Sequence, residues 1–445
     1  VSNFFQKSDA LYLLVFFLAV IAAGTTLLLI PAAWEPLNPE MGKLDPLDAL
    51  FTAASAVCVT GLATVNIANF SRLGQFILIC LVQVGGLGIV SVSSLLMTIP
   101  GHRLALWQRN VIRGFYVDGL EYRPRRIARN IIILTLTVEV IGMIVLSACF
   151  RSAGVEDWLF MGFFHGISAF CNAGFSPFEA GMISSSGNAP VLVTLMALII
   201  MGGLGFIVLQ DLFMVITGQK PRLSYHSRIV LSMTAGFILI GTLLFWLIER
   251  NRAFASMGPG GTLVNALFQA VTPRTAGFES VPQTSLTELS KMLTDILMLA
   301  GGAPGSIAGG IKVTTIFVVA MVAIKKPDEY GDIKIFHHRL GAETINHAVV
   351  YFLKAIILLL LCVAALFVTE GRSNASTDAI VFEAISAFST VGLSLNLTSS
   401  LSAGGKLVII AAMFAGRVGL IALAFPVMRY RKYDITYPEG SVLLG

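Results

Sequence analysis

The feature that most constrains this 445-residue chain is a series of eight long apolar stretches. A transmembrane helix needs about 20 apolar residues, because each residue adds about 1.5 Å across a hydrocarbon core about 30 Å thick. None of the eight stretches holds more than one Asp, Glu, Lys or Arg, and only 12% of the whole chain is charged. Soluble proteins carry about 25%, so a soluble globular enzyme is excluded. The predicted spans are Ala10–Ala33, Leu73–His102, Asn130–Phe150, Ala180–Gln210, Ile229–Ile248, Ile296–Ile324, His347–Thr369 and Leu407–Met428.

Four further apolar segments are too short to span. Each consists of about a dozen helix-compatible residues followed by a turn that contains glycine, which covers about half of the bilayer. Such a segment can enter and leave on the same side where protein or water lines its non-helical part. The sequence therefore predicts an all-α polytopic membrane protein with eight full spans. Its re-entrant segments are Leu47–Ala63, Trp158–Pro177, Leu263–Phe278 and Ala379–Leu395.

Basic residues gather on one side of these spans. The side that holds both termini carries 18 of the 30 Lys and Arg residues, and the opposite side carries nine. Because positive residues concentrate on the cytoplasmic side, we expect a multi-pass protein of the cell membrane with both termini in the cytoplasm. The basic link 101–129 and the tail from Arg429 are expected to contact a regulatory partner or anionic lipid. We expect no nucleic-acid partner.

The four re-entrant segments repeat one pattern. In each, an apolar residue precedes a glycine by ten positions, and the four glycines are 113, 103 and 115 residues apart. Two full crossings return the chain to its starting side, so successive repeats are parallel and related by an axis along the membrane normal. We expect four span–pore-helix–span repeats in a pseudo-fourfold arrangement around one pore. Their predicted boundaries are 1–115, 116–222, 223–339 and 340–445, with glycines Gly61, Gly174, Gly277 and Gly392.

The residues that lead to each glycine are candidates for an ion filter. Glycine reaches backbone angles closed to other residues, and a ring of carbonyl oxygens can replace the hydration shell of a potassium ion. No carboxylate occurs in these windows, which favours a monovalent cation, although Glu179 and Glu279 just beyond could concentrate cations. Tight helix packing is the alternative for one glycine, but four in register argue against it. The predicted K⁺ filter comprises Val59, Thr60, Gly61, Asn172, Ala173, Gly174, Thr275, Ala276, Gly277, Thr390, Val391 and Gly392.

A second glycine-rich landmark follows each filter window. It reads Gly-Gly-Leu-Gly at 85–88 and at 202–205, and its expected role is close helix contact. The third copy packs five glycines and a proline into a span, which cannot be helical throughout. We expect a loop below the filter that acts as a gate, with a static kink as the alternative. The predicted gate loop comprises Gly301, Gly302, Ala303, Pro304, Gly305, Ser306, Ile307, Ala308, Gly309, Gly310 and Lys312.

Two arginines lie near these features. Arg417, within the last span, is expected to face the ion path as an electrostatic barrier, and an ion pair with Glu139 is the alternative that stays open. Arg274 occupies the place of Cys58, Cys171 and Ser389 in the aligned windows. We expect it to be structural, because a cation in the conduction path would repel the ion.

These residues resemble the Trk/Ktr/HKT superfamily of potassium transporters. The segments 273–278 (PRTAGF) and 301–315 (GGAPGSIAGGIKVTT) are specific signatures of it, and the resemblance covers essentially the whole chain. Four repeats without extra N-terminal spans are most similar to the membrane subunit of the bacterial Ktr type. Some plant relatives carry serine at the first filter glycine and pass sodium, so Gly61 implies potassium selectivity.

The resemblance implies potassium uptake stimulated by Na⁺, with K⁺ as the transported ion held by the filter carbonyls. It implies a homodimer that docks on a cytosolic ring of nucleotide-binding regulatory subunits, so that nucleotides act only through this partner. It also assigns the filter role to the four glycines, the gate role to the loop and the barrier role to Arg417.

Three other functions compete with potassium transport. A coupled secondary transporter would usually place ionisable groups at the midplane for proton relay, and Glu139 is the only acid well inside a span. Sodium coupling through backbone oxygens is the alternative that stays open. An intramembrane enzyme would need a nucleophile–base pair or metal ligands, and the sequence shows neither. The five cysteines, an odd number without a CxxC pair, do not indicate a disulfide scaffold or a zinc site. A purely structural subunit does not account for four matched glycines.

Overall fold

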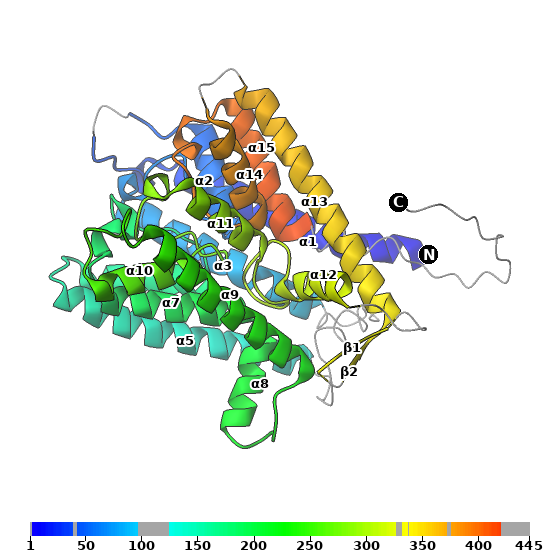
Figure 1. Ribbon diagram of the computed structural model, residues 1–445. Coiled ribbons are helices and arrows are strands. Elements are labelled where there is room, and N and C mark those ends of the chain that lie inside the picture. Colours follow the sequence, from blue (N-terminus) through cyan, green and yellow to red (C-terminus); the bar gives the residue numbers. More distant parts are fainter. Residues whose placement is uncertain are drawn as a thin grey trace.

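The computed structural model describes residues 2–38, 42–96, 124–325, 332–336, 338–371 and 375–419, and these are almost entirely helical (Figure 1). The first predicted repeat contains α1 (Ser2–Leu28), α2 (Pro46–Cys58) and α3 (Arg72–Leu96); the second contains α5 (Pro124–Ser152), α6 (Trp158–Phe170), α7 (Ala189–Leu204) and α8 (Phe206–Ile216). The third contains α9 (Tyr225–Glu249), α10 (Pro259–Val271), α11 (Glu288–Leu299) and α12 (Val313–Ile324); the fourth contains α13 (Ala342–Glu370), α14 (Thr377–Ser389) and α15 (Ala403–Phe414). A π-helical turn, Ala415–Gly419, follows α15, and short 3₁₀ turns lie at Pro31–Ala33, Ile67–Asn69, Gly181–Ser185, Gln283–Ser285 and Thr398–Ser400.

The helices begin at residues suited to that position. The Asp45 side chain accepts a hydrogen bond from the Leu47 amide at 2.7 Å, with Pro46 in the first turn of α2. Ser224, Thr287 and Ser402 cap α9, α11 and α15 in the same way. Such side chains satisfy amides that have no partner within the helix, so polar residues between apolar runs fix where each helix starts.

Four helices of 13 residues each, α2, α6, α10 and α14, coincide with the predicted re-entrant segments. Each packs against the helices on either side of it in the sequence: α1 and α3, α5 and α7, α9 and α11, α13 and α15. The later neighbour also packs against the next short helix, in the pairs α3–α6, α7–α10, α11–α14 and α15–α2. The contacts therefore run once around the molecule and close on themselves.

Three described helices are long and apolar enough to cross a membrane: α5 from Arg129, α9 and α13. Their outward faces are apolar, with Ile144, Leu239 and Val368 between 65% and 84% exposed, as expected of side chains that face lipid. The bent pair α7 and α8 adds a fourth crossing if it is counted as one span. These helices agree with a helical membrane protein, and the count of eight spans stays a prediction.

Two features differ from the sequence expectation. The apolar run Ala180–Gln210 is not one straight helix, because α7 begins at Ala189 and the chain bends by 104° between α7 and α8, at Gly205. A two-stranded antiparallel hairpin, β1 (Ile333–Ile335) and β2 (His338–Leu340), connects α12 to α13, and the all-helical prediction missed it. Most of the link 101–129 and the whole tail from Arg429 lie outside the described residues.

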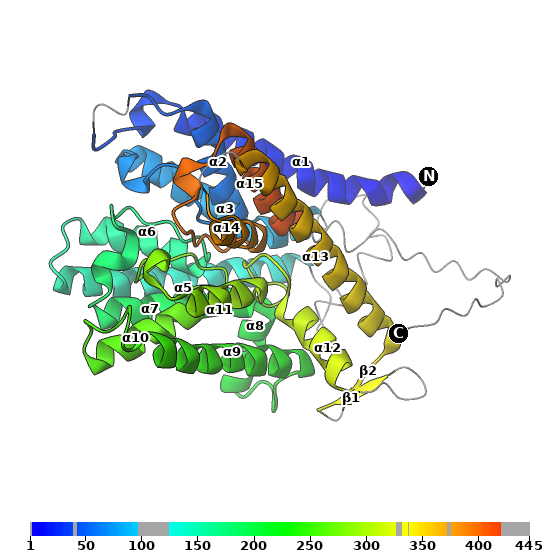
Figure 2. The same cartoon turned by 45° about the horizontal axis from the view of Figure 1, so that its top comes forward.

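The start of α1 and the β1–β2 hairpin lie at the same end of the molecule in both views (Figures 1 and 2). The loop between α11 and α12 lies near the middle, with α14 and α15 on one side and α7 and α9 on the other (Figure 1). This loop and the ends of the four short helices form the centre on which the functional interpretation depends.

Candidate functional site

The four predicted filter glycines lie next to one another in a closed ring. A Cβ atom added to Gly61 would lie 2.5 Å from the carbonyl oxygen of Ala173, just before Gly174. A Cβ on Gly174 would meet the Ala276 carbonyl, one on Gly277 the Val391 carbonyl, and one on Gly392 the Thr60 carbonyl. Each glycine thus presses on the window of the next repeat, and the fourth presses on the first. The structure brings all twelve predicted filter residues together.

The backbone of the windows alternates between two conformations. The first residue of each, Val59, Asn172, Thr275 and Thr390, has a φ between 52° and 70°. The glycine at the third position has a φ between 72° and 98°. The middle residue of each window has a negative φ. Alternating left- and right-handed conformations turn successive carbonyl groups to the same side, as rings of filter carbonyls require. Only glycine meets both the angle and the close contact at the third position.

Hydrogen bonds hold the amide side of these windows. The amides of Thr60, Ala173 and Val391 donate to the carbonyls of Ser55, Ser168 and Ser386 at 2.7 to 2.9 Å. The Ser55 and Ser386 hydroxyls also accept from the amides of Gly61 and Gly392, both at 3.1 Å. In contrast, no donor in the described part of the chain reaches a carbonyl oxygen of the twelve residues. The carbonyl groups are thereby left for another ligand.

Sequence reasoning missed these serines. The signal was present, because serine stands five residues into three of the four aligned windows, at 55, 168 and 386. In the third repeat the Thr272 carbonyl gives this support, because it accepts from the amides of Ala276 at 3.0 Å and Gly277 at 3.4 Å. The Thr272 hydroxyl also donates to the Phe278 carbonyl at 2.6 Å. Ser168 makes the matching bond to the Phe175 carbonyl at 2.8 Å.

The glycine-rich landmarks bring the outer helices close to the ends of the short ones. A Cβ on Gly85 would overlap the Val57 carbonyl, and one on Gly202 the Phe170 carbonyl. In the fourth repeat the corresponding landmark is 415–419 (AGRVG), where a Cβ on Gly416 would overlap the Phe388 carbonyl. Each of these carbonyls lies four residues before a filter glycine. Close helix contact is therefore confirmed as the role of three of the landmarks.

The predicted gate loop packs directly against one end of the ring. Gly309 has no room for a Cβ because of the Thr390 side chain, and Gly310, at φ 64°, packs against the backbone of Ser389. Residues Ile307 to Ile311 are buried. The loop is attached to the break between α7 and α8, where the Ala303 amide donates to the Gly203 carbonyl at 2.9 Å and the Phe206 amide to the Gly305 carbonyl at 3.2 Å. The loop lies at the end of the ring that the first residues of the windows form. The residues that follow the filter glycines therefore lie at the opposite end of the ring.

Two cationic side chains hold consecutive carbonyls of this loop. Lys312 donates to the Ala308 carbonyl, and Arg417, which is 3% exposed, donates to the Ile307 carbonyl. Arg417 also reaches the carbonyls of Gly85 at 2.8 Å and Gly86 at 3.4 Å. It therefore sits between the loop and α3, directly beneath the ring.

The alternative of an ion pair between Arg417 and Glu139 is wrong. The Glu139 carboxylate, 1% exposed, accepts from the Gln83 amide at 3.0 Å and from the Cys171 thiol at 3.8 Å instead. This carboxylate is buried in α5, and no Lys, Arg or His side chain of the described residues forms an ion pair with it. His165 is buried in α6, where its ring nitrogens lie 2.8 Å from the Met161 carbonyl and 2.9 Å from the Ser176 hydroxyl.

On the side away from the loop lie two acids. Glu279 lies two residues after Gly277, and burial raises its pKa to about 7, with the nearby Glu383 carboxylate adding to the shift. Glu383, fully buried, accepts from the Ser394 hydroxyl at 2.7 Å and from Thr398. Sequence reasoning named Glu279 and missed Glu383. In the described ranges no three His, Cys, Asp or Glu side chains gather as a metal site.

Comparisons with known proteins place this geometry in a family. The model of the family TrkH, described as a cation transport protein, matches residues 5–430. The chain is 36% identical to Ktr system potassium uptake protein B of Vibrio alginolyticus, over 97% of this chain and 94% of that protein. It is 35% identical to potassium/sodium uptake protein NtpJ of Enterococcus hirae, over 97% and 95%.

A solved structure shares the fold. The potassium transporter TrkH from Vibrio parahaemolyticus superposes with a TM-score of 0.74 at 18% identity, and the match covers 94% of this chain and 84% of that one. Because the family model spans nearly the whole sequence and relatives exceed 30% identity over 97% of it, the chain belongs to the TrkH family of cation transport proteins.

Proposed function

We propose that this chain takes up potassium across the cell membrane through the ring of four glycine windows. The observation that carries the proposal is the unequal bonding of the windows: their amides are held by the short helices, and their twelve carbonyls receive no donor from the described residues. Buried carbonyl groups without donors are costly, unless they bind a cation that has shed its water. Both curated relatives described above carry potassium uptake in their names.

The pore is formed by four parallel repeats with eight spans and cytoplasmic termini. The closed series of contacts from α3–α6 to α15–α2 supports a pseudo-fourfold arrangement. The repeat boundaries 1–115, 116–222, 223–339 and 340–445 place one short helix and one glycine window in each repeat.

The loop 301–312 acts as the gate and Arg417 as the barrier. The loop packs against the start of the fourth window, and a loop rich in glycine can move without large steric cost. The guanidinium beneath the ring adds a positive charge where a cation would leave the filter. The attraction of Arg417 for the loop carbonyls therefore favours a closed state at rest.

Regulation completes the proposal. The chain acts as a homodimer that docks on a cytosolic ring of nucleotide-binding subunits, and Na⁺ stimulates uptake. The name of the Vibrio alginolyticus relative, a protein of a Ktr system, supports a separate regulatory subunit, and the potassium/sodium name of the Enterococcus hirae protein supports a role for Na⁺. An intramembrane enzyme is excluded, because the family is one of cation transporters. Ion-coupled transport, by protons through Glu139 or by sodium through backbone oxygens, is the rival mechanism.

The test is growth of a bacterium that lacks its own potassium uptake. Cells that express the chain together with a regulatory ring subunit should grow at low potassium, and cells with Gly61→Ser should need more potassium. Gly236→Ser is the matched control, because a Cβ on Gly236 meets nothing within 4 Å. No growth with wild-type protein present in the membrane would contradict the proposal.

A further inference from the structure

Arg274 is a buried arginine without an acidic partner. Its side chain is 7% exposed, and one terminal nitrogen donates to the Thr234 hydroxyl at 3.3 Å. The guanidinium lies 5.8 Å from the centre of the Phe237 ring. Its Nε has no partner, and among the described residues no carboxylate lies within ion-pair distance. A buried cation with so little compensation needs another polar group to be stable.

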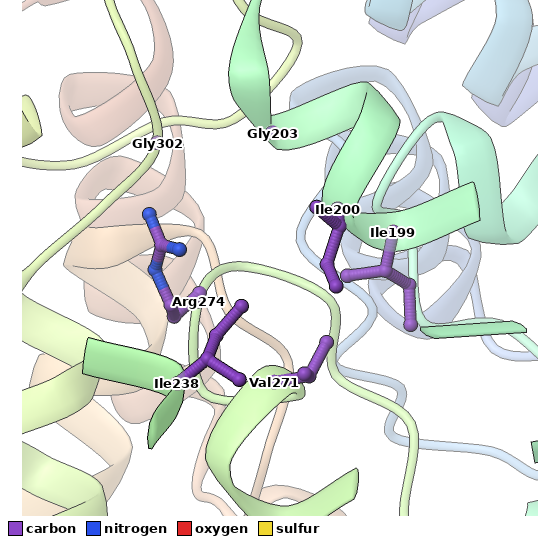
Figure 3. A pocket seen from close by; sticks show the side chains of 7 residues that line it. All are labelled: Ile199, Ile200, Gly203, Ile238, Val271, Arg274 and Gly302. Atoms are coloured by element: carbon purple, nitrogen blue, oxygen red, sulfur yellow. The ribbon is translucent and has the colours of Figure 1, made fainter. Parts of the chain in front are cut away.

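The guanidinium points into a small cavity. Figure 3 shows the side chain extending from the turn between α10 and the third window toward Gly302, with Gly203 of α7 across from it. The cavity volume is about 10 Å³, close to the smallest volume that holds one water molecule. The remaining lining is aliphatic: Ile199, Ile200, Ile238 and Val271. The polar groups that can face its interior are thus the guanidinium and the backbone of the two glycines.

This cavity lies at the junction between the gate loop and the bent helix pair. Gly203 accepts the amide of Ala303 at 2.9 Å, and Gly302 accepts the amide of Val313 at 3.1 Å. Each carbonyl oxygen has two lone pairs, so each can accept a second hydrogen bond. A water bound to Arg274 could therefore bridge to either carbonyl with full hydrogen bonding.

We propose that Arg274 is a positioning residue that holds the gate loop against the break between α7 and α8, through one water bound in this cavity. It thereby acts on the opposite side of the loop from Arg417, which binds the Ile307 carbonyl. The two guanidiniums keep the loop closed from both sides. This inference rests on the proposed gate role of the loop. Because Arg274 lies behind the third window, its positive charge does not obstruct the ion path.

The test measures amide hydrogen exchange in detergent-solubilised full-length protein. Arg274→Met keeps an unbranched apolar stem and removes the guanidinium with its donors, so exchange in peptides that cover 301–312 and 203–209 should become about tenfold faster or more. Thr234→Val is the matched control, because it removes the direct hydrogen bond of Arg274 and leaves the guanidinium at the cavity. It should leave exchange in both segments within about twofold of wild type.

Flux gives the second readout. Arg274→Met should raise potassium leak in liposomes without the regulator and leave the potassium-to-sodium ratio unchanged, since the filter is not altered. Arg274→Lys retains the charge but has a shorter reach to the cavity, so its potassium leak should lie between those of wild type and Arg274→Met. This variant replaces Arg274→Met in the test if the methionine variant does not fold. Unchanged exchange in the loop, or faster exchange confined to Thr275–Phe278, would overturn the inference. Exchange does not require transport, so a loosened loop in a chain that carries no potassium would refute the proposed function and leave this inference standing.

Discussion

The guanidinium of Arg417 donates to the carbonyl of Ile307, 110 residues earlier in the chain, while its other nitrogen reaches the Gly85 carbonyl at 2.8 Å. One buried side chain thus joins the last helix, the intramembrane loop and α3. All of its hydrogen-bonding partners in the described structure are backbone carbonyls, so the positive charge is solvated by dipoles and is not neutralised by an acid.

Replacing Arg417 should open the resting state. Arg417→Gln removes the charge and at least one of the carbonyl contacts, each of which contributes about 1.5–3 kcal/mol when the donor is charged. We expect potassium leak without the regulator to rise about tenfold or more, measured as isotopic rubidium flux into liposomes. Arg417→Lys should leak less than the glutamine variant because it keeps the charge.

Arg151→Gln is the control for this experiment. Arg151 is exposed at the end of α5 and stacks on Trp158, 5.3 Å from its ring centre, away from the loop. The Arg151→Gln variant should show the same rubidium flux as wild type. Equal leak in the Arg151 and Arg417 variants would show that Arg417 is no barrier.

Gly205 should not tolerate alanine. Its φ is 84°, and a Cβ would lie 3.0 Å from the Pro304 carbonyl and 3.2 Å from the Ser306 amide. We expect Gly205→Ala to destabilise the protein by about 1–3 kcal/mol and to change the basal flux, because the added atom pushes on the gate loop. Thermal unfolding in detergent and rubidium flux are the two measurements.

The comparison for this variant is Gly218→Ala. Gly218 has a similar φ of 73° but nothing within 4 Å of its Cβ. It should lose stability from backbone strain alone and keep wild-type flux. A flux change in both variants would show that backbone strain, and not contact with the loop, affects the gate.

Uptake should depend on pH near neutrality. Since burial raises the pKa of Glu279 to about 7, this acid is charged above pH 7 and neutral below it. Negative charge at the mouth concentrates cations, so the potassium concentration for half-maximal uptake should rise about two- to fivefold as the pH falls from 8 to 6. Glu279→Gln should give the higher value at both pH values, whereas Glu179→Gln should retain the dependence. A Glu279→Gln variant with the wild-type pH profile would show that Glu279 does not cause the pH dependence of uptake.

Glu139→Gln should preserve transport. The glutamine matches the shape of the acid and can still pair with Gln83 and Cys171. If the chain is a pore, potassium flux should stay within about twofold of wild type, without proton movement reported by a pH-sensitive dye in the liposome. Loss of potassium flux together with loss of a proton flux seen in wild type would favour the coupled rival.

The centre of the molecule could be predicted because its chemistry repeats. Four glycines in register point to one geometry four times, and the structure brings them into one ring. The broken span was also predictable, since five glycines and a proline cannot continue a helix. The partners of Arg417 were not predictable, because whether a buried arginine meets an acid or carbonyls depends on contacts between segments over 100 residues apart.

The bend at Gly205 shows what local sequence cannot determine. The tetrapeptide Gly-Gly-Leu-Gly occurs at 85–88 within the continuous helix α3 and at 202–205 at the end of α7. In the second copy, the amide of Phe206 bonds to the Gly305 carbonyl of the loop, and the helix turns away by 104°. Gly86 of the first copy also lies near the loop, facing the Ile307 side chain. Within the described residues, however, only the second copy is joined to the loop by backbone hydrogen bonds, and only there does the helix break.

The most direct test of the account is rubidium uptake into liposomes that contain the purified chain and its regulatory ring, for wild type beside the four single variants Gly61→Ser, Gly174→Ser, Gly277→Ser and Gly392→Ser. If the four glycines form one filter, all four variants should lose about tenfold or more of the preference for potassium over sodium, while Gly236→Ser keeps it. Wild-type selectivity in any folded variant of the four would contradict a filter built from a ring of all four windows.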